Sequence, residues 1–301
     1  MHDYIAGHIG EIAALMTAVC WTFTSLAFES AGKKVGSLQV NIIRLVIALI
    51  FLGIYTAITN GHFFPISAGK HAWLWLSLSG LVGFVIGDVM LFQAFVVTGA
   101  RVSMLIMSLS PPLTAFFGWL ILGEKMSWSN ILGMIITIWG IAIVVLARST
   151  KGQKIHFNYP VKGILLALGG ATGQGLGLVL SKLGMQQLDP FMSTQIRVIA
   201  AIAGFTLLFT ITRRWPMVLS TVKNKAAMLR ISTGAFFGPF LGVSLSLLAI
   251  QYTSTGVAAT LNSLTPVLII PLAHFFLKEP VSFREIAGAI LAVIGVSIFF
   301  I

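Results

Sequence analysis

One acidic residue, Asp88, stands deep inside a long apolar stretch of the sequence. Acidic side chains are rare in membrane-spanning segments, where they face a partner or a water-filled cavity. Because low-dielectric surroundings disfavour the charged carboxylate, Asp88 is a candidate for a group that takes up and releases a proton as its surroundings change. The alternative is a structural Asp that is held by backbone or hydroxyl groups and is chemically inert.

Two prolines, Pro111 and Pro266, each interrupt an apolar stretch near its middle. A proline lacks the N–H group and frees the carbonyl one helical turn before it, which kinks the helix. At membrane depth such carbonyls occur only where protein or a water-filled cavity receives them. We therefore predict that the neighbouring polar residues Ser110, Asn262 and Thr265 line a substrate cavity. The alternative is a structural kink in which hydroxyl groups replace the lost hydrogen bonds.

Trp21 stands in the middle of the first apolar stretch, away from the membrane interfaces where Trp is usual. Helical spacing puts Thr24 on the same face, and Gln174 occupies the matching position in the second half of the chain. A Trp in this place can contact a substrate by stacking or by a cation–π interaction. We predict that Trp21, Thr24 and Gln174 line the same cavity; the alternative for Trp21 is that it fills core space.

Arg44 and Arg197 each stand about two turns into an apolar stretch, at matching positions in the two halves. Long basic side chains near the end of a membrane span extend their charge to the surface. We expect surface-directed or structural arginines, with binding of a substrate carboxylate as the alternative.

Common catalytic and nucleotide-binding motifs are absent from the sequence, including H-E-x-x-H, G-x-S-x-G and the Walker A pattern. The single cysteine, Cys20, allows no intrachain disulfide and no Cys-based metal site. We therefore expect no catalytic residues, no cofactor and no metal site, and we expect that the protein is not an enzyme.

The elements that position these residues follow from composition. The chain has 301 residues, of which 57% are hydrophobic and 9% charged, whereas soluble domains carry about 25% charged residues. A membrane-spanning helix needs about 20 apolar residues. We predict an all-α polytopic membrane protein with ten transmembrane helices, at residues 9–28, 37–59, 72–96, 102–122, 128–147, 162–183, 190–212, 229–251, 256–277 and 284–301.

An internal repeat divides the chain at the basic loop of residues 148–162. A shift of 155 positions places Ser108 on Ser263, Ser110 on Thr265, Pro111 on Pro266, Leu122 on Leu277 and Glu124 on Glu279. A register kept over most of both halves indicates a true repeat. Because each half holds an odd number of spans, the second half must enter the membrane from the opposite side. We predict two inverted five-helix repeats, residues 1–150 and 151–301, as in carriers that alternate access around a midplane site.

Local patterns and charge complete the prediction. Small residues at Gly80, Gly83 and Gly87 favour close helix packing over sliding, and Ser282 with Glu285 fits a capping box. The net charge of +11 comes from Lys and Arg between apolar stretches, so nucleic-acid binding is not expected. The positive-inside rule favours both termini on the outer side.

The repeated features Ala18-x-x-Trp21, Ala249-x-x-Tyr252 and Leu122-Gly123-Glu124, with the two proline-centred spans, carry a family resemblance. Over nearly its whole length the chain resembles the EamA family of the drug/metabolite transporter superfamily, and bacterial amino-acid exporters of the YddG type in particular. The resemblance implies ten helices, two inverted halves and transport of small metabolites. Relatives are usually drawn with cytoplasmic termini, against the charge count. The second half departs from the family pattern at two positions: Gln174 stands where the first half has Trp21, and Lys278 stands where it has Gly123.

We therefore expect a secondary exporter of small metabolites, most simply of aromatic or other apolar amino acids, that alternates access around a central cavity. The expected setting is a monomer spanning the bilayer of a bacterial inner membrane several times, with a small-molecule substrate and no nucleic acid. The alternatives are a carrier for another metabolite or a drug, a channel, and a polytopic membrane enzyme.

Overall fold

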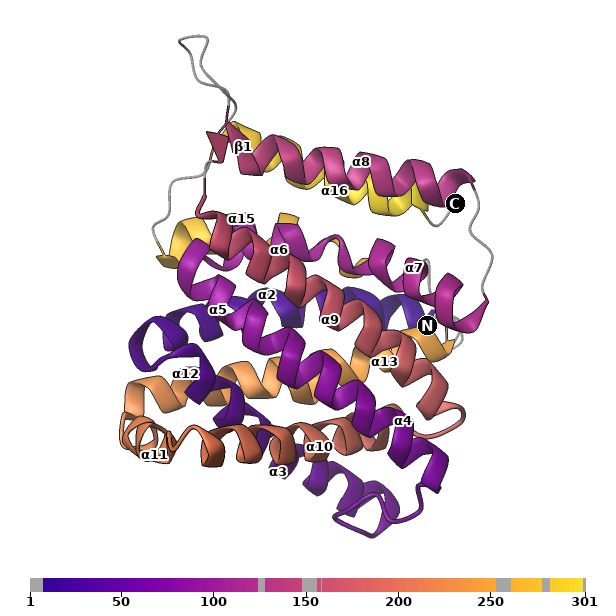
Figure 1. The fold of residues 1–301 in the computed structure, drawn as a ribbon. Helices are drawn as coiled ribbons and strands as arrows, with labels where there is room; N and C mark the ends of the chain where they lie inside the picture. Colours follow the sequence, from indigo (N-terminus) through magenta and orange to yellow (C-terminus); the bar gives the residue numbers. More distant parts are fainter. Residues whose placement is uncertain are drawn as a thin grey trace.

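The structure, a computed structural model, describes residues 8–123, 128–147, 156–157, 159–252, 261–277 and 282–299. The first half contains α2 (Ile9–Val35), α3 (Ser37–Asn60), α4 (Lys70–Gly80), the π-helix η1 (Leu81–Gly87), α5 (Asp88–Thr98), α6 (Ala100–Met107), α7 (Ser110–Leu122) and α8 (Trp128–Val145). Helices α4, η1 and α5 follow one another as one continuous span, and α6 and α7 form another (Figure 1).

The second half repeats this order. It contains α9 (Val161–Met185), α10 (Pro190–Ile211), the short α11 (Trp215–Val222), α12 (Lys225–Ala235), the π-helix η2 (Phe236–Gly242), α13 (Val243–Tyr252), α15 (Thr265–Leu277) and α16 (Phe283–Phe299). Between the halves, the two-residue strands β1 (Leu146–Ala147) and β2 (His156–Phe157) pair in antiparallel register. The predicted repeat members Glu124, Lys278 and Glu279 lie outside the described residues.

Seven of the ten predicted spans are helices that are long and apolar enough to cross a membrane, counted over the described residues. The other three correspond to α8, α15 and α16, whose described parts are shorter apolar helices. The prediction of ten spans is therefore confirmed for seven. The outer surface is rich in large apolar side chains, such as Ile58 at 79% exposure on α3, as expected for lipid contact.

Breaks in the helices recur at matching repeat positions. The π-helices η1 and η2 occupy equivalent residues in the two halves, and α7 and α15 begin at the equivalent residues Ser110 and Thr265 and end at Leu122 and Leu277. A π-helical segment carries an extra residue in a turn and is found most often at functional sites. The repeat in sequence is thus also a repeat in backbone irregularity.

Helix contacts follow the same register. A Cβ atom added to Gly173 of α9 would lie 2.6 Å from Cα of Gly87 in η1. At the equivalent place in the other half, a Cβ atom on Gly242 of η2 would lie 3.4 Å from Cβ of Cys20 in α2. Close backbone approach through small residues is how helices pack in membranes. The predicted tight packing of the glycine face is therefore confirmed.

Helices α8 and α16 form a separate pair, drawn side by side at the top of Figure 1. A Cβ atom on Gly140 would lie 2.8 Å from the carbonyl oxygen of Gly288, and one on Gly295 would lie 2.9 Å from the carbonyl oxygen of Gly133. The repeat matches Gly133 with Gly288 and Gly140 with Gly295, so each contact maps onto the other when the halves are exchanged. The contact between α8 and α16 is therefore self-complementary in its glycines.

Candidate functional site

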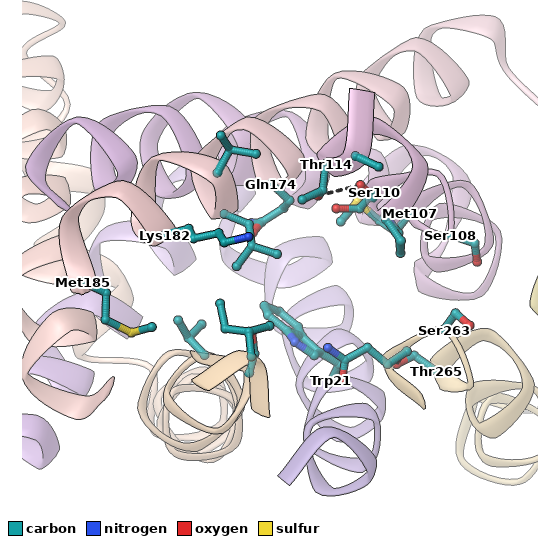
Figure 2. Close-up of a pocket in the computed structure, with 18 of the residues that line it drawn as sticks. Trp21, Met107, Ser108, Ser110, Thr114, Gln174, Lys182, Met185, Ser263 and Thr265 are labelled. Atoms are coloured by element: carbon teal, nitrogen blue, oxygen red, sulfur yellow. Dashed lines mark hydrogen bonds between the residues drawn. The ribbon is translucent and has the colours of Figure 1, made fainter. Parts of the chain in front are cut away.

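A central cavity of about 480 Å³ lies between the two halves of the bundle (Figure 2). The first half contributes side chains from α2, α5, α6 and α7, and the second half contributes side chains from α9, α10, α13 and α15. Binding pockets for small molecules have volumes of about 300–1,000 Å³ and mostly apolar walls with a few polar groups. The cavity fits this description in both respects.

The cavity opens toward one end of the bundle. Three of its lining residues stand at helix ends: Leu122 ends α7, Met185 ends α9, and Gln251 lies one residue before the end of α13. These helix ends lie at the right of Figure 1, where α4 begins. The lining reaches inward as far as Met104 of α6 and Arg197 of α10.

Five of the six residues predicted to bind substrate line this cavity: Trp21, Ser110, Gln174, Asn262 and Thr265. Pro111 and Pro266, the predicted kink residues, line it as well. Figure 2 shows Trp21 across the cavity from Gln174, and Ser110 next to Thr114. The structure therefore brings together residues that are up to 244 positions apart in the sequence, from Trp21 to Thr265.

Thr24, the sixth residue, is not part of the cavity lining. Its side chain is buried, and its hydroxyl donates a 3.4 Å hydrogen bond to the carbonyl oxygen of Gly234. Its methyl group lies against η2, where a Cβ atom on Gly238 would be 2.7 Å from Cγ2 of Thr24. The prediction for Thr24 is therefore corrected. Although Thr24 lies about one helical turn from Trp21, its side chain packs against a neighbouring helix and does not face the cavity.

The two interpretations of the proline-centred spans are both met at Pro266, and the cavity interpretation is met at Pro111. The helix breaks between α6 and α7, where Leu109 donates a 3.0 Å hydrogen bond to the carbonyl of Ile106. Before Pro266, the hydroxyl of Thr265 donates a 2.8 Å hydrogen bond to the carbonyl oxygen of Asn262, which the proline leaves free. At Pro266 a hydroxyl group thus replaces a lost hydrogen bond, and both prolines also line the cavity.

Asp88 is held in a fully buried polar cluster. Its carboxylate forms an ion pair with the Arg44 guanidinium, and its other oxygen accepts a 2.7 Å hydrogen bond from the amide of Gln174. Asn41 accepts hydrogen bonds from Arg44 at 3.0 and 3.2 Å and donates one of 3.2 Å to the backbone carbonyl of Asp88. Gln174 alone of these residues also lines the cavity, so it connects Asp88 with the substrate space.

Arg44 and Arg197 were expected to be surface-directed or structural, and the surface-directed part of this expectation is wrong. Arg44 has an exposed fraction of 0% and Arg197 one of 3%. The guanidinium carbon of Arg197 lies 4.7 Å from the centre of the Phe84 ring, and that of Arg44 lies 5.7 Å from the same ring. A snorkelling arginine needs a free path to the surface, but η1 lies directly on α10, where a Cβ atom on Gly80 would clash with the carbonyl of Arg197.

Arg197, unlike Arg44, lines the cavity. The sequence predicted a surface-directed or structural role for Arg197, with binding of a substrate carboxylate as the alternative. The signal that singles out Arg197 is its match with Arg44 in the repeat. Lys182 also lines the cavity, but it is exposed and stands in the last turn of α9, near the mouth. No sequence pattern singled out Lys182.

Three polar atoms of the lining are buried without a hydrogen-bond partner among the described residues: the side-chain oxygens of Asn262 and Ser108 and the Nε atom of Arg197. Buried polar atoms in proteins are normally paired, so each exception needs an explanation such as a ligand or ordered water. Their position makes a bound solute the natural partner.

An ion pair between the halves lies at the other end of the bundle. A guanidinium nitrogen of Arg101, at the start of α6, lies 3.1 Å from a carboxylate oxygen of Glu285, at the start of α16. The hydroxyl of Tyr159 donates a 2.7 Å hydrogen bond to the same carboxylate. The predicted capping box is confirmed: Ser282 donates its N–H to the Glu285 carboxylate at 2.9 Å, and Glu285 donates its N–H to the Ser282 hydroxyl at 3.3 Å.

Over the residues that the structure describes, no group of three or more His, Cys, Asp or Glu side chains is arranged to hold a metal ion. The described lining of the cavity offers one guanidinium, one ammonium, amide and hydroxyl groups, and apolar walls.

Comparison with known proteins gives a family match in each half. The sequence model of the EamA-like transporter family matches residues 8–146 and residues 161–301. A transporter of Archaeoglobus fulgidus is 21% identical over 285 residues, which is 95% of each chain. The inner membrane transporter YhbE of Escherichia coli is 28% identical over 139 residues, which is 46% of this chain and 42% of YhbE. Both relatives bear the name of uncharacterized transporters.

A solved crystal structure has a similar fold. It superposes with a TM-score of 0.67 at 18% sequence identity, covering 96% of this chain and 95% of the other.

Proposed function

Because the chain belongs to the EamA-like transporter family, we propose that it exports aromatic or other apolar amino acids by alternating access around the central cavity. The family makes it a multi-pass membrane transporter of small molecules and not an enzyme. The substrate, the direction and the mechanism are the content of the proposal.

The observation that carries the proposal is a cavity built from equivalent elements of both halves and open toward one end of the bundle. In carriers with inverted repeats the substrate site lies between the repeats, and rocking of one against the other exposes it to each side in turn. The kinked spans α6–α7 and α15 border the cavity and are suited to bend in this step. The proposal includes a two-fold axis in the membrane plane that relates residues 1–150 to residues 151–301.

The choice of an amino acid rests on the lining. The walls are largely apolar and include Trp21, whose ring offers stacking, and the flexible side chains of Met104 and Met107, which adapt to different shapes. The unpaired side-chain oxygen of Asn262 can accept a hydrogen bond from a substrate ammonium group. An amino acid with an apolar side chain and a charged ammonium group meets both requirements.

The test is counterflow in proteoliposomes that contain the purified protein. Vesicles loaded with unlabelled phenylalanine are expected to accumulate labelled phenylalanine transiently, at a rate that saturates with concentration. A channel would give flux without counterflow, and stimulation by other solutes but by no amino acid would contradict the proposed substrate.

Direction and setting belong to the same proposal. The relative YhbE is named as an inner membrane transporter, which supports placement in a bacterial inner membrane, and we propose a monomer as the working unit. Cells that overproduce the protein should release more phenylalanine into the medium than cells with an empty vector. Faster uptake without faster release would reverse the proposed direction.

A further inference from the structure

A charge imbalance is built into the middle of the protein. Arg44 is neutralised by the Asp88 carboxylate, which also accepts the hydrogen bond from Gln174. Arg44 and Asp88 are fully buried and their opposite charges balance, although one guanidinium nitrogen of Arg44 has no hydrogen-bond partner among the described residues.

The repeat predicts a second cluster of the same design. Arg197 matches Arg44, Trp21 matches Gln174, and Val243 matches Asp88. The register is the one followed by the helix contacts of α9 with η1 and of α2 with η2. The second cluster therefore has its arginine but carries no acid at position 243, and all three of its members line the cavity.

The missing acid leaves Arg197 uncompensated. Among the described residues none forms an ion pair or hydrogen bond with its guanidinium, and its Nε atom is buried without a partner. Its guanidinium lies beside Gly83 and over the Phe84 ring, and it feels the charge of Asp88 without pairing with it, because Asp88 is already paired with Arg44. A buried charge without a partner is costly, so an anion that enters from the cavity gains a strong interaction.

From this asymmetry we infer that Arg197 binds the carboxylate group of the transported solute. The solute carboxylate takes the place of the acidic side chain that the repeat would predict near Trp21, at the position of Val243. The inference rests on the proposed function and adds the chemical class of the substrate: a solute with one carboxylate. Arg44 and Arg197 carry two positive charges and Asp88 carries one negative charge, so one positive charge remains. A single substrate carboxylate neutralises it.

Lys182 is the competing cation in the lining. It is exposed to water at the mouth, where an ammonium group is already well solvated and gains little from a carboxylate. Arg197 lies at the buried end of the lining, where the same contact is much stronger because water does not screen it. Lys182 is therefore a site of first encounter at most.

The test compares three solutes of one shape: phenylalanine, its carboxamide and 3-phenylpropionate, which keeps the carboxylate but lacks the ammonium group. Their affinities are measured by competition with labelled phenylalanine and by thermal stabilisation of the purified protein. The wild-type protein is expected to prefer phenylalanine to its carboxamide by about 10- to 100-fold, the ratio of one lost charge-assisted hydrogen bond.

Two variants supply the missing acid or its neutral analogue. Val243→Asp supplies a carboxylate at the position that matches Asp88 in the repeat. On the inference it pairs with Arg197, so it should weaken phenylalanine binding by about 10-fold or more and raise the melting temperature of the empty protein relative to Val243→Asn. Val243→Asn has the same size without the charge. Equal loss of binding in both variants would mean that position 243 acts through its shape alone, and would overturn the inference.

Arg197→Gln removes the cation, and Arg197→Lys keeps a charge in the same place. The Gln variant should lose the preference for phenylalanine over its carboxamide, and the Lys variant should keep part of it, while Lys182→Gln should keep it in full. Loss of the preference in Lys182→Gln, or its survival in Arg197→Gln, would overturn the assignment to Arg197.

The outcomes separate this inference from the proposed function. If 3-phenylpropionate is transported with the same dependence on Arg197 and phenylalanine is not, the carboxylate site stands and the amino-acid proposal fails. If phenylalanine and its carboxamide are transported alike in every variant, amino-acid transport stands and the carboxylate site fails.

Discussion

Arg101 of α6 and Glu285 of α16 are joined by a 3.1 Å ion pair that connects the two halves at the end of the bundle away from the cavity mouth. Both side chains are mostly buried, at 12% and 7% exposure, so the pair is less screened than one on the surface. A carrier that opens toward this end must separate the two helices, and the ion pair opposes that step.

Glu285→Gln should therefore favour opening at this end. Glutamine keeps an oxygen for the Tyr159 hydroxyl and remains a capping-box residue for Ser282, so the charge is the main loss. We expect the open form to gain about tenfold in population if the pair contributes about 1.4 kcal/mol.

The measurement uses a cysteine reporter at Leu105, a buried residue of the small pocket beside this ion pair. Cys20 is itself buried and is replaced by Ser so that the reporter is the single thiol. Leu105→Cys should react faster with a membrane-impermeant maleimide when Glu285 is Gln. Unchanged reactivity would show that the ion pair does not hold this end closed.

The predicted substrate contacts are tested by Trp21→Ala and Asn262→Ala. Removing the indole or the unpaired amide oxygen should raise the KM for phenylalanine by about 5- to 30-fold each, since each removes about 1–2 kcal/mol of contact. Thr24→Val is the matched control, because Thr24 contacts Gly238 and Gly234 and not the cavity. If the two alanine variants keep the wild-type KM and rate, the cavity faces are misassigned.

Repeat spacing predicted most of this cavity. Pro111 and Pro266 mark the kinked spans in any reading of the sequence, and the polar residues beside them had to face either a cavity or the kink. Thr24 could not be separated from Trp21 by helical spacing alone, because the lateral position of η2 decides which side of α2 is covered. For Arg197 the sequence could not decide between a surface-directed and a structural role, because the sequence of a span end does not show which helix packs over it.

Helix packing between the halves gives a third prediction. A Cβ atom on Gly173 would lie 2.6 Å from Cα of Gly87 and 3.3 Å from the carbonyl oxygen of Val82, and backbone cannot move aside as a side chain can. Gly173→Ala should lower the free energy of unfolding by about 1–3 kcal/mol, as overpacking does. Gly69→Ala, where no atom lies within 4 Å, is the control. Equal melting temperatures of the two variants would contradict the close approach of α9 and η1.

The π-helical form of η1 and η2 could not be predicted from the sequence, for a different reason. The glycines at 83, 87, 238 and 242 predict close approach, but nothing in their spacing predicts a widened turn. A π-helical turn forms when tertiary contacts stabilise a backbone that local propensity disfavours. For η1 these contacts are its packing against α10 and the packing of its Phe84 ring against the guanidinium groups of Arg44 and Arg197.

Asp88 remains the proposed proton-coupling group, and the structure gives that proposal a definite geometry. To accept a proton Asp88 must give up its ion pair with Arg44, and Gln174 is the group through which the state of the cavity reaches it. Entry of a carboxylate beside Arg197 adds a negative charge near Asp88 and favours its protonation, which would link substrate binding to proton uptake.

Asp88→Asn tests this coupling. Asparagine keeps a polar side chain for Gln174 but leaves Arg44 buried without a counter-charge, which should lower stability by about 3–5 kcal/mol. Folding is therefore confirmed first by the melting temperature, and Asp88→Asn with Arg44→Gln, which removes both charges, serves as the matched control. In proteoliposomes we expect the neutral variants to retain phenylalanine counterflow without a gradient and to lose accumulation driven by a pH gradient. If a folded variant without the Asp88 charge still accumulates phenylalanine against its gradient when a pH difference is imposed, Asp88 serves structure alone and the driving ion binds elsewhere.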